Sequence, residues 1–294
     1  MKLEAPTLTS NLPPKLYRGL LMLTCSWSGS RVSEGSLLIK VHDVPNATKL
    51  PLIWCGGPVE MPAVISVCGQ QRNIYALRGT YEFVQPTHDV ITALSRYYAD
   101  EIERTIAAKS YLIAGNCAAA YIAIEIAEVL HNRGCHVGFL GIVERDVSVN
   151  TFPLKVARKI YTKIDRIGTL TQRFLNAFFG DNSGASKIES IKKMADVVIK
   201  KFKKATLDSR TLIQYKSLEN DKTYQLKQYH DKISLIFVSW GVFGFYRFNF
   251  FQKYWRKLAP KGITVDIING FSHENPPWVN IIKALNKRLV EAGY

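Results

Sequence analysis

A chain of 294 residues lies at the upper end of what one hydrophobic core supports, and 47% of its residues are apolar, which argues against disorder over most of its length. No apolar run approaches the roughly 20 residues that span a bilayer, so a transmembrane protein is not expected. The formal net charge of +15 favours an acidic partner.

The cysteines limit the chemistry further. There are five, and no two of them form a C-x-x-C pair. An odd number without such pairs argues against a disulfide framework and against a zinc site. We therefore expect no metal ion, and a reducing cytoplasm as the setting.

The predicted elements begin after a segment of mixed character. We interpret residues 1–35 as an N-terminal extension and residues 36–294 as the folded domain. Apolar runs then predict buried strands over 52–54 and 74–77, separated by a glycine-containing loop. Amphipathic spacing predicts a helix over 88–107.

The alternation continues with a strand over 111–114, a helix over 118–132 and a strand over 137–143. Strand, helix and strand in this order imply parallel pairing with right-handed crossovers. The expected fold is therefore α/β, with a mostly parallel central sheet flanked by helices. The same alternation resumes near the C-terminus, with strands over 233–239 and 263–268 and helices over 248–258 and 278–289.

Between these two parts, the segment from about 151 to 215 breaks the alternation. Helical periodicity over 154–179 and 188–204 predicts a helical insertion. Residues 151–210 carry 14 Lys or Arg against 5 Asp or Glu, so the positive charge belongs mainly to this segment. No nucleic-acid-binding motif accompanies the charge, and nucleic acid is not the expected partner.

The candidate nucleophile follows the strand over 111–114. That strand turns into a helix at Gly115-Asn116-Cys117, and three alanines come next. A nucleophile at such an elbow projects its reactive atom at the carboxyl edge of the sheet, and its neighbours must be small because strand and helix pass closely. The helix N-terminus also lowers the pKa of a thiol. Cys117 is therefore the predicted nucleophile, and a buried structural cysteine is the alternative.

Two further residues follow predicted strands at the same edge. Glu144 ends the strand over 137–143, and His273 comes soon after the last strand. Nucleophile, acid and then His is the chain order of α/β-hydrolase triads, and ligands of α/β sheets bind at this edge. We predict His273 as the base and Glu144 as the residue that orients it. An exposed strand-end charge and an ordinary loop histidine are the alternatives.

These roles predict acyl transfer in two steps. His273 takes the thiol proton, the thiolate attacks an acyl thioester, and an acyl-enzyme forms on Cys117 before a second nucleophile releases the product. Backbone N–H groups are expected to stabilise the oxyanion. The predicted donors are Ala118 and one residue of the loop Cys55, Gly56 and Gly57.

From about residue 37 onwards the sequence resembles the thioesterase domains that end nonribosomal peptide synthetases and polyketide synthases. The matching stretches are 51–57, 74–79, 97–102, 111–127 and 270–273. The resemblance implies an α/β-hydrolase fold. It also implies a helical lid between the acid-bearing strand and the later strands, at about 151–215.

The sequence departs from the usual family pattern at three positions. Most members have Ser in place of Cys117, Asp in place of Glu144 and Gly in place of Ala119, although a Cys and Glu variant with Gly-Asn-Cys at the elbow occurs among them. A thioester intermediate is more open to amine attack than an ester is. Transfer to an amine or cyclisation is therefore as plausible as hydrolysis.

The resemblance also implies a partner. The substrate would arrive on the phosphopantetheine arm of an acyl or peptidyl carrier protein, or of a synthase module, and no cofactor would be bound to the enzyme. Such carriers are acidic, so the basic side chains of the insertion are candidates for docking them. These are Lys192, Lys193, Lys200, Lys201, Lys203 and Lys204.

The expected function is release of an acyl or peptidyl chain from its carrier by hydrolysis, cyclisation or transfer to an amine. One alternative is an acyltransferase that moves acyl groups between carriers. The other is a catalytically silent binding module with this fold, which the Ala-Ala-Ala sequence after Cys117 suggests.

Overall fold

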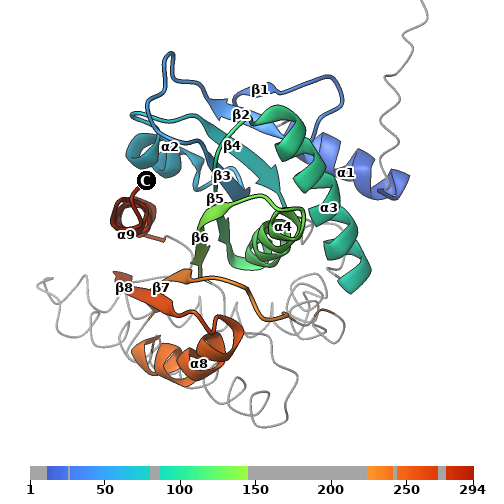
Figure 1. Ribbon diagram of the computed structural model, residues 1–294. Helices are drawn as coiled ribbons and strands as arrows, with labels where there is room; N and C mark the ends of the chain where they lie inside the picture. The colour runs from blue at the N-terminus through green and yellow to red at the C-terminus, as the bar shows by residue number, and fades with distance from the viewer. Residues whose placement is uncertain are drawn as a thin grey trace, which may run out of the picture.

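The described part of the chain is built around one sheet of eight strands in the order β1-β2-β4-β3-β5-β6-β7-β8 (Figure 1). The structure is a computed structural model that describes residues 12–25, 27–79, 87–144, 224, 226–240, 244–270 and 276–294. The strands are β1 Ser30–Arg31, β2 Ile39–His42, β3 Leu52–Gly56, β4 Ile74–Arg78, β5 Tyr111–Asn116, β6 Val137–Val143, β7 Ile233–Trp240 and β8 Ile263–Gly270.

Helices cover both faces of this sheet. Those within the described residues are α1 Pro14–Thr24, α2 Met61–Cys68, α3 His88–Thr105, α4 Ala120–Asn132, α8 Gly244–Leu258 and α9 Trp278–Glu291. Side chains of α1, α3, α4 and α8 share one hydrophobic cluster, and those of α2 and α9 share the other. In Figure 1, α2 and α9 accordingly lie on the side of the sheet opposite α3 and α4.

The direction of the strands decides where the functional residues meet. At one edge β2 pairs antiparallel with both β1 and β4, and the pairs from β4 through β3, β5, β6 and β7 to β8 are all parallel. β3 and β4 are buried along their whole length, which is why they consist almost entirely of apolar residues. The carboxyl ends of the parallel strands therefore share one edge of the sheet.

Local signals fix the long helix α3. The Thr87 side chain accepts a hydrogen bond from the Val90 N–H at 3.3 Å, so it caps the helix N-terminus. Asp89 in the first turn and Arg104 in the last complement the helix dipole. The predicted amphipathic helix in this region is confirmed, and it ends at Thr105.

The predicted α/β architecture, with a mostly parallel sheet flanked by helices, is confirmed. Two helices were not predicted. α1 begins at Pro14, in the segment of mixed character that was interpreted as an N-terminal extension, and its Leu16 and Leu20 are buried in the core. α2 lies in the sequence between the first two predicted strands.

Two sequence-based boundaries remain predictions. The division between an extension over 1–35 and a domain over 36–294 is one of them, and the predicted helical lid over about 151–215 lies outside the described residues. Among the residues that the structure describes, no helix is both long enough and apolar enough to cross a membrane.

Candidate active site

Cys117 lies in the turn between β5 and α4. β5 ends at Asn116, a short 3-10 turn spans Cys117–Ala119, and α4 begins at Ala120. The Cys117 backbone has a φ of 50°, in the left-handed region that residues other than glycine rarely adopt. Its side chain is exposed. A strained strand-to-helix turn with an exposed thiol is the geometry of a nucleophile elbow.

Small residues allow this turn to form. A Cβ atom on Gly115 would stand 2.7 Å from the Ala123 Cβ and 2.8 Å from the Ala120 Cα, so α4 passes too close to β5 for any larger residue. Ala119 and Ala120 are buried in the same contact. The alanines after Cys117 therefore have a packing role, because they let the helix start directly against the strand.

Glu144 leaves the sheet next to Cys117. Asn116 of β5 is in register with Val143 of β6, and each is followed by a residue with a φ of 50°. The Glu144 N–H donates to the Ile236 carbonyl at 2.9 Å, and the Glu144 carboxylate accepts a hydrogen bond from the Val238 N–H. These contacts with β7 hold the carboxylate at the edge of the sheet, on the side towards β8.

The other predicted triad residue lies outside the described residues. His273 comes three positions after Gly270, the last residue of β8, which is in register with Trp240 of β7. The end of β8, three positions before His273, therefore lies at the same edge of the sheet as Cys117 and Glu144. The six lysines proposed for carrier docking also fall outside the described residues.

The predicted oxyanion donors lie around the end of β3. Cys55 and Gly56 belong to the strand itself, and Cys55 is in register with Gly115 of β5. Gly57 follows directly and is buried. Ala118 lies in the turn after Cys117 and is half-buried. The loop and the elbow therefore come from adjacent strands.

A buried carboxylate that the sequence did not reveal lies between this loop and the elbow. The Glu60 side chain is 4% exposed, and its Oε1 accepts hydrogen bonds from the Gly57 N–H at 2.6 Å, from Trp54 Nε1 at 3.4 Å and from Asn116 Nδ2 at 3.4 Å. An oxyanion that uses the Gly57 N–H thus shares this donor with Glu60. A single Glu in a loop carries no sequence motif, so only the structure identifies it.

The cysteines differ in their environments. Burial raises the pKa of the Cys55 thiol far above its ordinary value, and it raises the pKa of the Cys68 thiol to about 11. Both thiols therefore stay protonated and unreactive at neutral pH. Cys117 and Cys25 are the cysteines with exposed side chains. Among the described residues there is no group of three or more His, Cys, Asp or Glu that could hold a metal ion.

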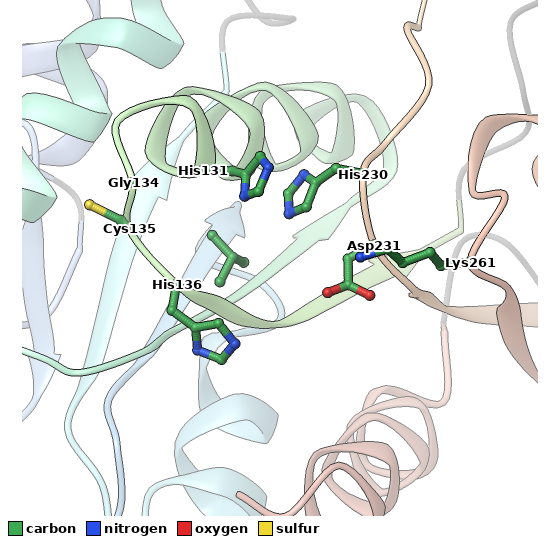
Figure 2. Close-up of a pocket in the computed structure, with 8 residues that line it drawn as sticks. His131, Gly134, Cys135, His136, His230, Asp231 and Lys261 are labelled. Carbon is green, nitrogen blue, oxygen red and sulfur yellow. The ribbon is translucent and has the colours of Figure 1, made fainter.

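A second cluster of polar groups lies at the opposite end of β6. Figure 2 shows His131 and His230 face to face there, with ring centroids 3.4 Å apart. These two residues, His136 and Lys261 are among those that line a cavity of about 360 Å³. His136 precedes β6, whereas Glu144 follows it, and a strand of this length spans about 20 Å. The cavity is therefore separate from the candidate active site.

Comparisons with known proteins identify the family. The model of the thioesterase domain family matches residues 65–274. Among solved structures, the thioesterase domain of NocB from the nocardicin cluster has 14% sequence identity and a TM-score of 0.50, over 85% of this chain and 96% of that chain. YbtT, a type II thioesterase from the yersiniabactin NRPS/PKS pathway, has 14% identity and a TM-score of 0.48, over 87% and 97%. A search of curated protein sequences found no match.

Proposed function

This chain belongs to the thioesterase domain family and has the α/β-hydrolase fold, and on that premise we propose that it releases or transfers an acyl or peptidyl chain from a carrier thioester through an acyl-enzyme on Cys117. In this proposal His273 is the base and Glu144 is the residue that orients it. The alternatives are an acyltransferase that moves acyl groups between carriers and a silent binding module.

The observation that carries this proposal is the backbone at Cys117. The Cys117 thiol is exposed, and the residue has a φ of 50° between a buried strand and the start of a helix. Strain of this kind is retained when the surrounding structure requires it, and it is concentrated at active sites. The same φ at Glu144, one strand away, supports a shared functional reason for both turns.

The first step forms the acyl-enzyme. His273 removes the proton from Cys117 Sγ, and the thiolate attacks the carbonyl carbon of the substrate thioester. The negative charge moves to the carbonyl oxygen, where the Ala118 N–H and a donor of the β3–α2 loop stabilise it. The bond to the carrier thiolate then breaks, and the His273 imidazolium returns its proton to that sulfur.

The second step releases the product. Water, an amine or a hydroxyl of the chain itself attacks the acyl-enzyme carbonyl while His273 takes its proton. The Cys117–acyl bond breaks and the thiol is restored. Glu144 acts throughout by holding one imidazole tautomer and by stabilising the imidazolium, as the carboxylate of a triad does.

The proposed partner is an acidic carrier protein, which the positive charge of the chain would attract. The net charge of +15, and the concentration of Lys residues in the segment 192–204, favour the approach of an acidic protein that delivers a phosphopantetheine thioester. We propose that this reaction takes place in the cytoplasm. The five cysteines are free thiols, and free thiols are typical of a reducing compartment.

Turnover of a simple thioester tests the proposal. We expect the wild type to release thiol from an acyl-N-acetylcysteamine and Cys117→Ala to lose that activity. Cys25→Ala is the matched control, because Cys25 is also exposed but lies in the segment after α1. Equal turnover by the wild type and Cys117→Ala would contradict the proposal, and no turnover by any variant would favour the silent module.

The choice of acceptor is a separate question. A Cys nucleophile gives a thioester intermediate, which reacts more readily with amines than the ester formed by Ser does. We therefore expect added amine to divert product from the free acid to the amide in the wild type. Cys117→Ser, if active, is expected to give a lower ratio of amide to acid, which chromatography of the products measures.

A further inference from the structure

The Glu60 carboxylate joins two parts of the candidate active site that are far apart in the chain. Gly57 and Glu60 belong to the loop between β3 and α2. Asn116 is the last residue of β5 and directly precedes Cys117. One oxygen of Glu60 accepts hydrogen bonds from both the Gly57 N–H and the Asn116 side chain, at 2.6 and 3.4 Å. A single oxygen of Glu60 therefore links the loop that contains Gly57 to the turn that contains Cys117.

Burial of the Glu60 carboxylate costs free energy unless hydrogen bonds such as these compensate for it. Glu60 is 4% exposed, and Glu is almost never so deeply buried without partners. The Asn116 amide has to turn its nitrogen towards Glu60, because its oxygen would face the carboxylate charge. Within the part of the chain that the structure describes, the buried Asn116 Oδ1 has no hydrogen-bond partner. The contact of Nδ2 with Glu60 therefore decides the orientation of the Asn116 side chain among these residues.

The loop is shaped to receive the same carboxylate. A Cβ atom on Gly56 would stand 2.2 Å from Glu60 Oε1, and one on Gly57 would stand 3.5 Å from Glu60 Oε2 and 3.0 Å from Arg78 Nη1. Glu60 and the buried Arg78 thus flank Gly57 with opposite charges. The two glycines leave the space that the Glu60 side chain needs beneath the backbone.

We propose that Glu60 is a positioning residue, which fixes the backbone of the oxyanion loop against the nucleophile elbow through Gly57 and Asn116. The inference rests on the proposed function, because it assigns Glu60 to the acyl-transfer site. Oxyanion donors work only when they are preorganised where charge develops. Loss of Glu60 is therefore expected to affect the chemical step rather than the binding of the thioester.

The test compares Glu60→Ala and Glu60→Gln in the thioester assay. Displacement of a donor by an ångström costs up to about a hundredfold in rate, so we expect Glu60→Ala to lower kcat by about ten- to a hundredfold with KM changed less than about twofold. Glu60→Gln keeps an oxygen that accepts from the Gly57 N–H and is expected to recover most of the loss. Alkylation of Cys117 by iodoacetamide needs no oxyanion donor, and its rate should stay close to that of the wild type.

Two further variants separate positioning from general stability. Asn116→Ala removes the other partner, and the double variant Glu60→Ala with Asn116→Ala should lose no more than the worse single variant, because both act through one contact. Glu101→Gln is the matched control. Glu101 is also a buried carboxylate, 1% exposed, but it lies on α3 and contacts Ser36 and Arg104. It should change the melting temperature and not kcat.

Several results would overturn the inference. An unchanged kcat in Glu60→Ala would remove the positioning role, and a raised kcat would show that Glu60 obstructs the Gly57 donor. Equal losses of turnover and of Cys117 alkylation would mean that the site as a whole has collapsed. A wild type without turnover would overturn the proposed function, and the role of Glu60 with it. Activity that is lost in Cys117→Ala and kept in Glu60→Ala would overturn this inference alone.

Discussion

Cys117 and Glu144 follow directly on residues that pair across β5 and β6, and both adopt a φ of 50°. The sheet register alone therefore brings the two residues to the ends of adjacent strands at one edge of the sheet. Each residue departs from the extended strand in the same left-handed conformation, which residues other than glycine adopt at a cost of order 1–3 kcal/mol. The shared conformation is what we would expect of two residues that serve one site.

Glu144→Gln tests the role of the carboxylate. The Gln oxygen still accepts from the Val238 N–H, but a neutral amide does not stabilise an imidazolium. We expect kcat to fall by about 10²- to 10⁴-fold, with the unfolding free energy changed by less than about 1.5 kcal/mol. Glu34→Gln, at an exposed position, is the control. Wild-type turnover by Glu144→Gln would remove Glu144 from the proposed triad.

Gly115→Ala tests the close packing beneath the elbow. The new Cβ would meet the Ala120 backbone at 2.8 Å, so α4 has to move away from β5 and carry Cys117 with it. We expect a loss of about 1–3 kcal/mol in unfolding free energy and a fall in kcat. Gly134→Ala is the control, since its Cβ would meet nothing within 4 Å. Its φ of +84° makes it destabilising, by about 1 kcal/mol, without a change in kcat. A fully active Gly115→Ala would contradict this packing argument.

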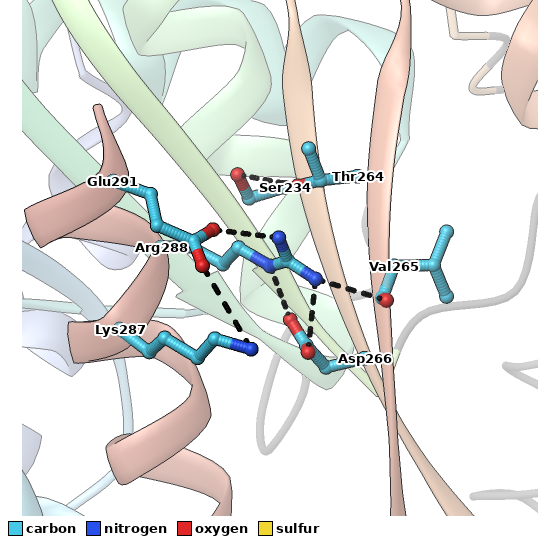
Figure 3. A network of polar contacts seen from close by, with 7 residues as sticks. All are labelled: Ser234, Thr264, Val265, Asp266, Lys287, Arg288 and Glu291. Carbon is cyan, nitrogen blue, oxygen red and sulfur yellow. Dashed lines mark hydrogen bonds and ion pairs between the residues drawn. The ribbon is translucent and has the colours of Figure 1, made fainter.

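Arg288 on α9 binds Asp266 on β8 (Figure 3). These two elements come before and after the segment that contains His273. Arg288 Nε and Nη2 donate to the Asp266 carboxylate at 2.5 and 3.0 Å, and Arg288 Nη1 donates to Glu291 at 2.6 Å. The hydrogen bonds to Asp266 are also the main reason that the pKa of Arg288 is raised. We expect Arg288→Ala to lower the unfolding free energy by about 1.5–3 kcal/mol, measured by urea denaturation.

Lys287 on the same helix is the matched control for Arg288. Its ion pair with Glu291 is 3.7 Å long, and the two side chains are 61% and 45% exposed. An exposed pair of this kind contributes about 0–1 kcal/mol, so Lys287→Ala should be nearly neutral. Equal effects of the two substitutions would mean that the bidentate contact with Asp266 adds nothing to stability.

The Cys68 thiol makes stability depend on alkaline pH. Burial raises its pKa from 9.0 to about 11, with Arg72 acting weakly in the opposite direction. The folded protein therefore keeps this proton to a higher pH than the unfolded chain does. The contribution of the protonated Cys68 thiol to stability is fully present below about pH 8.5 and is lost as the pH rises towards 11. The total loss of unfolding free energy is about 2–3 kcal/mol. Burial also raises the pKa of the Cys55 thiol, so this thiol changes stability with pH in the same direction.

Urea denaturation at pH 7.5 and pH 10.5 checks this dependence. We expect the wild type to lose more stability between the two pH values than Cys68→Ala does, because the variant lacks the thiol. The comparison between pH values cancels the small packing cost of the substitution. Parallel losses in the two proteins would show that Cys68 does not ionise differently in the folded and unfolded states.

The sheet was predictable from sequence because its central strands are buried on both faces. Apolar runs such as 52–54 and 111–114 have few other interpretations. The strands extend two residues beyond these runs, to Gly56 and Asn116. Apolar runs do not report such ends, because pairing with a neighbouring strand continues after the side chains cease to be apolar.

The helices that were missed lack the signals that periodicity needs. α2 has eight residues, of which Ser66 is the only polar one, so it shows no contrast between two faces. α1 follows Pro13 and begins at Pro14, and proline marks helix starts as well as turns. Both errors arise because the deciding contacts come from the rest of the fold.

For the candidate site, the sequence was enough to propose the residues and their order, which stay a prediction, but not the shape of the site. Small residues after Cys117 and charges after predicted strands were enough to propose the triad. The left-handed backbone at Cys117 and Glu144 depends on tertiary packing. The hydrogen bond between Asn116 and Glu60 joins residues 56 positions apart. No local pattern encodes a contact over that distance.

The most direct measurement is intact mass spectrometry after incubation with an acyl-phosphopantetheinyl carrier, followed by peptide mapping of any adduct. We expect the mass of one acyl group on the wild type and on Cys25→Ala, located on Cys117, and no adduct on Cys117→Ala. An adduct that persists in Cys117→Ala, or one that maps to another residue, would contradict the assignment of Cys117 as the nucleophile.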